Sequence, residues 1–126
     1  MKTLYLITFL FATVTLKAQE PMALLAGSKA PIIDALDYQQ KAFSLDKSLA
    51  TGPVVVVFYR GEWCSYCNKH MSQLEESISE FKKLGASVVA ITPEQPKFVK
   101  KTVKKTNASF RIISDHEHKI MDAWGV

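Results

Sequence analysis

The chain has 126 residues, with 16 Lys or Arg and 12 Asp or Glu, so its formal net charge is +4. A chain of this length builds one small domain with an adequate core. Two lysines, Lys2 and Lys17, precede the expected domain, and without them the net charge is +2. Such a small excess favours no nucleic-acid partner and no anionic membrane surface.

Residues 1–18 have the layout of a secretory signal peptide. Lys2 supplies the positive start, residues 4–16 are an apolar stretch, and Ala18 is a small residue at the expected cleavage point. The apolar stretch is shorter than the roughly 20 residues that a membrane-spanning helix needs. No cysteine follows it, so we expect no lipid anchor and no stable membrane anchor. The pattern predicts export to the periplasm or the extracellular space.

Export would place both cysteines, Cys64 and Cys67, in an oxidising compartment. We expect a leader over residues 19–30 and the folded domain over residues 31–126. In that setting a C-x-x-C pair is a structural disulfide, half of a metal site or a redox pair. A disulfide that closes so short a loop constrains little of the unfolded chain and stabilises the fold little. The redox role is therefore the stronger interpretation.

Strands come first along the domain. Residues 31–45 alternate apolar and polar side chains around a turn at Asp37–Gln40, which predicts a short hairpin. Residues 53–59, "PVVVVFY", form a continuous β-branched and aromatic run. Such a run predicts a strand covered on both faces, of the kind found in the centre of an α/β sheet.

A helix is predicted over residues 65–84, where the hydrophobic period changes. Apolar residues recur there at steps of three and four, at Cys67, Met71, Leu74, Ile78 and Phe81. Gly85 is placed to end this helix, as glycine commonly does.

The remaining elements continue the alternation. Residues 86–92 read as a second buried strand, 97–106 as a helix, 109–113 as a third short strand, and 117–125 as a helix or turn. Strands that alternate with helices over short connections predict a mainly parallel sheet with right-handed crossovers. The expected fold class is α/β.

The C-x-x-C pair stands between a predicted strand and a predicted helix. Free N–H groups and the positive dipole end at a helix N-terminus stabilise a thiolate, which is the nucleophile in disulfide exchange. Cys67 lies in register with the apolar stripe and should face the core, so we expect Cys64 to be the more exposed sulfur. This geometry favours Cys64 as the attacking thiolate and Cys67 as the resolving thiol of a Cys64–Cys67 disulfide cycle.

The segment "FYRGEWCSYC" resembles the active-site segment of the thioredoxin-like superfamily, in which a Trp precedes C-x-x-C. Its flanks are similar to the AhpC/TSA (peroxiredoxin) branch, above all to peroxiredoxin-like proteins that carry C-x-x-C. The resemblance extends from about Gly27 to Val126, through "GASVVAITPE" and "FRIISDHEHKIMDAWGV". It implies a thioredoxin-like three-layer fold with a mainly parallel central sheet, truncated after the third parallel strand and the following helix.

The two branches nominate different sulfurs. Thioredoxins imply attack by Cys64. The peroxiredoxin pattern places Phe58 and Tyr59 as in that branch, puts Arg60 where it has Pro and Cys64 where it has Thr, and implies attack on peroxide by Cys67. Since that Pro and Thr are both replaced, the resemblance to the peroxide-activating site is partial.

Other expected residues also depart from the two branches. The distal arginine of peroxiredoxins would lie beyond this chain, leaving only Arg60 or Arg111 to substitute for it. Thioredoxins have a buried carboxylate where this chain has Phe58, so the proton of the resolving cysteine would pass to water, or to a neighbour such as Glu62 or His70.

The sequence therefore predicts an exported thiol–disulfide oxidoreductase with Cys64 and Cys67 as catalytic residues. Trp63 is expected to pack over the disulfide or contact a partner, and Arg60 to support the cysteines. The expected partners are protein thiols and disulfides, with an external thiol as electron donor. We expect no cofactor and no metal, since zinc would need two more ligands.

Two alternatives stay open. One is a peroxiredoxin-like peroxidase that reduces hydroperoxides at Cys67, with Cys64 resolving the sulfenic acid. The other is a truncated, non-enzymatic domain with a permanent disulfide.

The helix predicted at 97–106 carries a set of lysines that we expect to form a solvated face. These are Lys97, Lys100, Lys101, Lys104 and Lys105.

Overall fold

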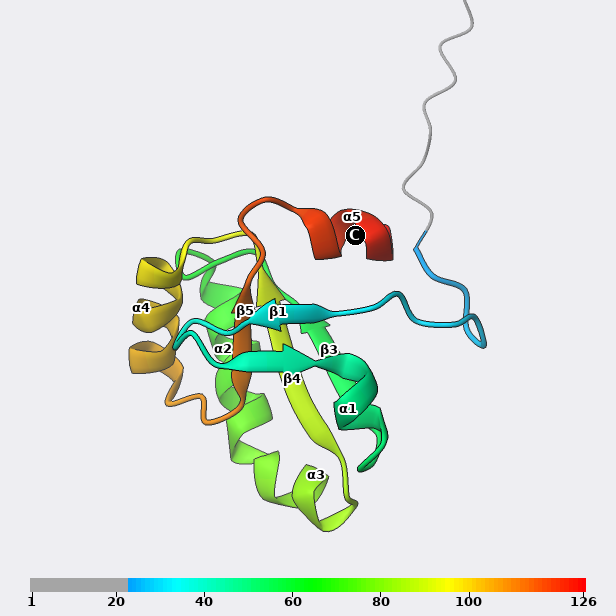
Figure 1. Cartoon of the computed structure of the whole chain (residues 1–126). Helices are drawn as coiled ribbons and strands as arrows, with labels where there is room; N and C mark the ends of the chain where they lie inside the picture. Colours follow the sequence, from blue (N-terminus) through cyan, green and yellow to red (C-terminus); the bar gives the residue numbers. More distant parts are fainter. Residues whose placement is uncertain (1–22) are drawn as a thin grey trace, which may run out of the picture.

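The computed structural model describes residues 23–126 (Figure 1). The predicted signal peptide over residues 1–18 and the first four residues of the predicted leader, 19–22, lie outside the described residues. None of the helices within residues 23–126 is long and apolar enough to cross a membrane.

A three-stranded parallel sheet forms the middle layer. Its strands are β3 (Val54–Phe58), β4 (Ser87–Thr92) and β5 (Arg111–Ser114), in the order β3-β4-β5. All three are rich in β-branched residues, which fit a pleated and covered surface. The prediction of a mainly parallel sheet is confirmed.

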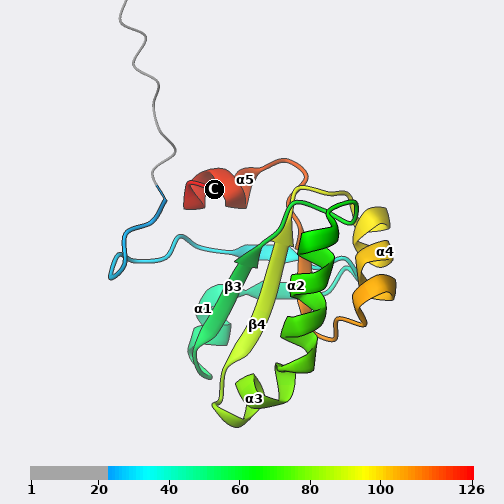
Figure 2. The same ribbon diagram turned by 180° about the vertical axis from the view of Figure 1, so that it is seen from behind.

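One layer covers each face of the sheet: long helices on one face, and a hairpin with two short helices on the other. On one face lie α2 (Ser65–Glu76), α3 (Ile78–Lys83) and α4 (Pro96–Thr106), as Figure 2 shows. On the other face lies the predicted hairpin, with α1 and α5 beside it (Figure 1). The elements of this second layer are β1 (Asp34–Leu36), β2 (Ala42–Ser44), α1 (Leu45–Leu49) and α5 (Lys119–Trp124).

Each face of the sheet has its own hydrophobic core. In β4, Val88 and Ala90 point to the face covered by the long helices, whereas Val89 and Ile91 point to the hairpin face. All four are buried, as expected of a strand that alternates between two covered faces. The hairpin joins the sheet through a bridge from Asp37 to Ile113.

The central strand is β4, not the strand predicted over residues 53–59. β3 pairs with β4 alone, so among the described residues it is an edge strand, and all five of its residues are only half-buried. The prediction that both faces of this run are covered is confirmed, because Val55 packs on one core and Val56 on the other. The prediction that it is central was wrong, since an apolar run does not reveal which of two buried strands has two neighbours.

The helix predicted over residues 65–84 is two helices. α2 ends before Ser77, whose ψ of 1° departs from the helical value, and α3 begins at Ile78. The apolar stripe is nevertheless confirmed across this break, because Met71, Ile78 and Phe81 pack in the same core. Gly85 ends the segment with a φ of +72°, as predicted.

Candidate active site

The two cysteines lie where β3 leads into α2. Cys64 is the N-cap of α2 and Cys67 lies in its first turn, with 5.2 Å between their Cα atoms and a disulfide between their sulfurs. The backbone N–H of Cys67 donates a hydrogen bond to Sγ of Cys64 at 3.3 Å. The N–H of Cys64 in turn donates to the carbonyl of Gly61 at 3.1 Å. The sequence thus located the pair and its helix N-terminus correctly.

The relative exposure of the two cysteines is the reverse of the prediction. Cys64 is 9% exposed, whereas Cys67 is half-buried and packs against the core between the sheet and α2. The stripe argument placed Cys67 correctly against the core. It could not place Cys64, because an N-cap residue precedes the helix and does not belong to the helical stripe.

Aromatic side chains next to the pair point outward. Trp63 is 60% exposed and Tyr66, which lies between the cysteines, is 88% exposed. Trp63 is therefore not a core residue, and its predicted contact with a partner stays a prediction. Arg60 is exposed and lies over the Trp63 ring, with its Cζ 4.6 Å from the ring centroid. The contact that the structure gives Arg60 is thus with Trp63.

Glu62 is held between the loop and α4. Its carboxylate accepts a hydrogen bond from Lys105 Nζ at 2.6 Å and lies 3.7 Å from Lys101 Nζ. The hydrogen bond from Lys105 holds the pKa of Glu62 below its usual range. Two lysines of the predicted solvated face therefore contact the active-site loop. His70, the other predicted proton acceptor, is exposed.

Glu94 is a site residue that the sequence reasoning missed. Its Oε2 accepts the backbone N–H of Glu62 at 2.8 Å, and burial raises the pKa of its carboxyl group. Glu94 follows β4 closely, at the same edge of the sheet from which β3 leads to the cysteines. The carboxyl ends of neighbouring parallel strands meet at one edge of a sheet. The position of Glu94 just after a predicted strand could therefore have placed it near the cysteines.

Tyr59, directly after β3, is buried on the side of the long helices. Burial raises the pKa of its hydroxyl group to about 12.

Arg111 does not belong to the site. It pairs with the buried Asp37 at 3.0 Å and donates to the carbonyl of Ala42, so it ties the hairpin to β5. The side chain of Asp37 in turn accepts the backbone N–H groups of Gln39 and Lys41 in the hairpin turn. Arg111 is thus held by Asp37 and Ala42. This geometry does not support the prediction that Arg111 replaces the distal arginine of peroxiredoxins.

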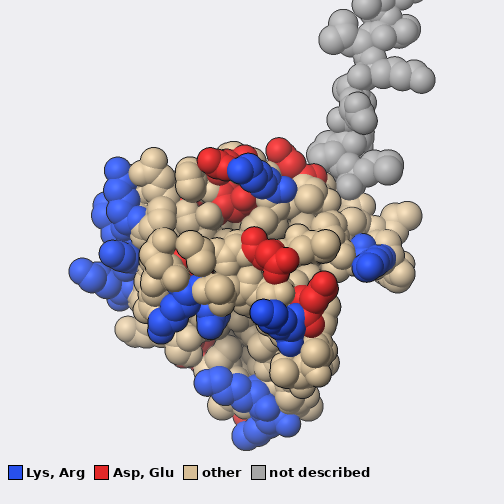
Figure 3. Space-filling model, in the orientation of Figure 1, with Lys and Arg blue, Asp and Glu red and all other residues tan. Residues whose placement is uncertain are grey.

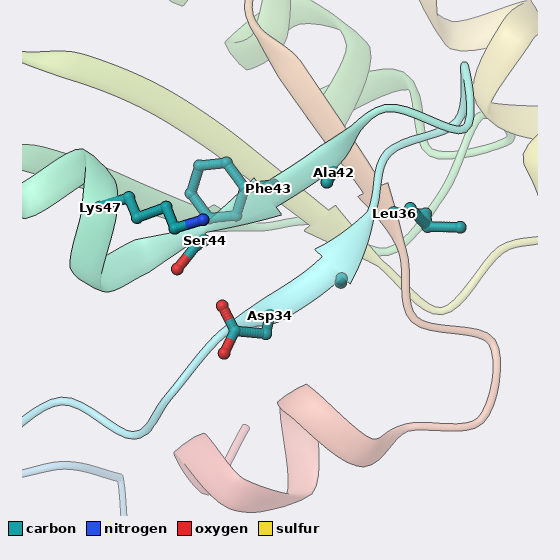
Figure 4. A pocket seen from close by; sticks show the side chains of 7 residues that line it. Asp34, Leu36, Ala42, Phe43, Ser44 and Lys47 are labelled. Carbon is teal, nitrogen blue, oxygen red and sulfur yellow. The ribbon is translucent and has the colours of Figure 1, made fainter.

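Other surface features lie away from the cysteines. A shallow pocket on the hairpin is lined by residues such as Asp34, Phe43 and Lys47 and includes neither cysteine (Figure 4). Basic side chains gather along one side of the molecule, over α4 (Figure 3). Within residues 23–126 no group of three His, Cys, Asp or Glu side chains is arranged to hold a metal ion.

A disulfide-bonded C-x-x-C pair caps the helix that follows a parallel strand inside a three-layer α/β fold, and this combination defines the thioredoxin-like class of domains. The AhpC/TSA family model matches residues 26–126, and the chain belongs to this family.

Relatives and solved structures agree with this assignment. The chain is 36% identical over 100 residues to the chloroplastic peroxiredoxin Q of Populus jackii, covering 79% of this chain and 46% of that protein. It is 30% identical to the putative peroxiredoxin bcp of Haemophilus influenzae, of which it covers 64%. The chain thus spans about half the length of the chloroplastic relatives that it matches.

Two kinds of solved structure share the fold. Peroxidoxin BcpB from Mycobacterium tuberculosis superposes with a TM-score of 0.74 at 23% identity, over 79% of this chain and 65% of that one. A putative thiol:disulfide interchange protein DsbE from Chlorobium tepidum gives 0.72 at 23% identity, over 82% and 72%. At this identity the likeness shows the thioredoxin-like fold alone, so the choice between the two chemistries has to come from the site.

Proposed function

We propose that the chain is an exported thiol–disulfide oxidoreductase in which Cys64 attacks and Cys67 resolves. The observation that carries the assignment is the hydrogen bond from the N–H of Cys67 to Sγ of Cys64 at the start of α2. A donated N–H and the positive end of a helix stabilise a thiolate at Cys64. Exposure does not favour Cys64, so the proposal rests on this hydrogen bond and on the N-cap position.

The reaction is a pair of exchange steps. The Cys64 thiolate attacks a sulfur of a protein disulfide, forms a mixed disulfide and releases one substrate thiolate. The Cys67 thiolate then attacks Sγ of Cys64 and releases the second substrate thiolate. The substrate gains two electrons, and the chain is left with the Cys64–Cys67 disulfide. An external thiol donor returns the pair to the dithiol.

A second candidate is a thiol peroxidase, favoured by the peroxiredoxin Q relatives. In this reaction the Cys67 thiolate attacks a hydroperoxide, takes one oxygen as sulfenic acid and, with a proton, releases an alcohol or water. The Cys64 thiolate then attacks the sulfenic sulfur, forms the same disulfide and, with a second proton from solvent, releases water. The two candidates end in one oxidised state and differ in which sulfur reacts first.

Single-cysteine variants separate the candidates. If Cys64 attacks, Cys67→Ser traps Cys64 in a mixed disulfide with an insulin chain during insulin reduction, and Cys64→Ser abolishes turnover. Stopped-flow oxidation of the reduced chain by hydrogen peroxide tests the second candidate. Oxidation much faster than that of a free thiol, retained in Cys64→Ser and lost in Cys67→Ser, would establish the peroxidase and overturn the first assignment.

Two further measurements address the other expectations. A pair that dithiothreitol reduces only in denaturant would support the permanent structural disulfide instead. The export proposal rests on the pattern of residues 1–18. N-terminal sequencing of the mature chain from an expressing host tests it, with a new terminus at Gln19 expected.

A further inference from the structure

The loop between β3 and α2 is short and tightly turned. Gly61 has a φ of +152°, a conformation that side chains rarely adopt, and its carbonyl accepts the N–H of Cys64. A Cβ on Gly61 would lie 2.5 Å from Oε1 of Glu94 and 2.8 Å from Nε1 of Trp63. The loop backbone therefore lies directly against the Glu94 carboxylate, and small changes in this loop move the N-cap cysteine.

Glu62, the next residue, has both of its backbone polar groups bound. Its N–H donates to Oε2 of Glu94 at 2.8 Å, and its carbonyl accepts from Nδ2 of Asn68 at 2.7 Å and from Nζ of Lys105 at 3.2 Å. Asn68 and Lys105 lie on α2 and α4. Glu94 is therefore the acceptor that joins this loop to the segment after β4.

Glu94 is itself anchored to the sheet. Its backbone N–H donates to Oγ1 of Thr92, the last residue of β4, at 3.4 Å. Its carbonyl accepts the hydroxyl of Ser114, the last residue of β5. Because both contacts are to strand ends, the carboxylate is presented to the loop from a rigid support.

We propose that Glu94 is a positioning residue for the redox pair: by accepting the N–H of Glu62 it holds the Gly61–Trp63 turn and thereby keeps Cys64 at the N-cap of α2. This inference rests on the proposed function. Glu94 does not touch the sulfurs and acts through the loop. An acceptor oxygen at this place is what matters, and the charge of the carboxylate is secondary.

Variants at position 94 can separate these two properties. Glu94→Gln keeps an acceptor oxygen and removes the charge, whereas Glu94→Ala removes both. Glu75→Ala is the matched control, because Glu75 also accepts a backbone N–H, that of Ser109 at 2.7 Å, but on a loop remote in sequence from the cysteines. The charged groups around Glu94 are Glu62, Lys101 and Lys105, with the ionisable Tyr59 beside them, and all stay in place.

The measurement is the rate of alkylation of Cys64 by iodoacetamide against pH, in the full chain carrying Cys67→Ser so that one thiol reacts. We expect Glu94→Ala to slow alkylation on the acidic limb about tenfold, which is a shift of the midpoint by about one pH unit. Glu94→Gln should restore the wild-type rate within about twofold, and Glu75→Ala should leave it unchanged. Hydrogen exchange at the Glu62 amide should speed up in Glu94→Ala only.

Three results overturn the proposal. These are an unchanged profile in Glu94→Ala, equal slowing in Glu94→Ala and Glu94→Gln, and equal slowing in Glu94→Ala and Glu75→Ala. If Glu94→Ala fails to fold by circular dichroism, the comparison of Glu94→Gln with wild type still decides whether charge matters. Alkylation reports on Cys64 without any disulfide substrate, so this test can succeed even if insulin reduction fails.

Discussion

Substituting Gly61 by Ala tests the close approach of the loop to Glu94. The new Cβ would lie 2.5 Å from the Glu94 carboxylate, so the carboxylate has to move and its hydrogen bond to Glu62 is lost. Backbone strain costs about 1–3 kcal/mol at such a φ, and a hydrogen bond to a charged group contributes about 1.5–3 kcal/mol. We expect the free energy of unfolding to fall by about 3–5 kcal/mol, the middle of the summed range.

Urea unfolding followed by circular dichroism measures this change, and Gly85→Ala is its control. Gly85 also has a positive φ, of +72°, but nothing lies within 4 Å of the position of its Cβ. It should therefore show backbone strain alone, about 1–2 kcal/mol. If Gly61→Ala costs no more than Gly85→Ala, the carboxylate is not pressed against the loop, and our description of the turn is wrong.

Three further predictions concern substitutions of Met71, Glu62 and Tyr59. Met71→Ala should lower the free energy of unfolding by about 2–5 kcal/mol in urea titrations, because its fully buried side chain leaves a cavity. Pairing with Lys105 lowers the pKa of Glu62 in the folded state. The pairing therefore stabilises the fold at pH values above the pKa of Glu62 in the unfolded chain, and this stabilisation is lost as the pH falls through the pKa in the folded state. In unfolding curves at acidic pH, the stability difference between wild type and Glu62→Gln should vanish. Tyr59, with a pKa raised to about 12, should make wild type lose stability between about pH 10 and 12, and Tyr59→Phe should lack this loss in alkaline unfolding curves.

Most of the fold follows from local patterns in the sequence. Continuous β-branched runs located β3 and β4, and the three-four spacing located α2 and its buried face. The hairpin around Asp37 and the end of α3 at Gly85 also followed from turn and capping residues. These patterns did not contain the pairing of the strands: β3 is the more apolar of the two, yet β4 is central because it alone has two neighbours.

The location of the cysteine pair was predicted from the sequence, but its surroundings were not. The C-x-x-C spacing and the strand-to-helix junction identified Cys64 and Cys67. The Glu62–Glu94 contact joins residues 32 apart in sequence, and the only signal for it was the position of Glu94 just after a strand. The sequence left open whether Trp63 packs over the disulfide or contacts a partner, because a tryptophan before the pair looks the same in sequence whether it packs inward or outward.

The edge position of β3 bears on how the chemistry should be measured. Within residues 23–126 no strand pairs with its second edge, so the backbone N–H and C=O groups of Val54–Phe58 that face away from β4 can pair with another chain. Such association becomes stronger as protein concentration rises, whereas closure of the Cys64–Cys67 disulfide is a first-order event within one molecule. A rate constant that changes when the sample is diluted would therefore report on strands meeting between molecules rather than on sulfur chemistry.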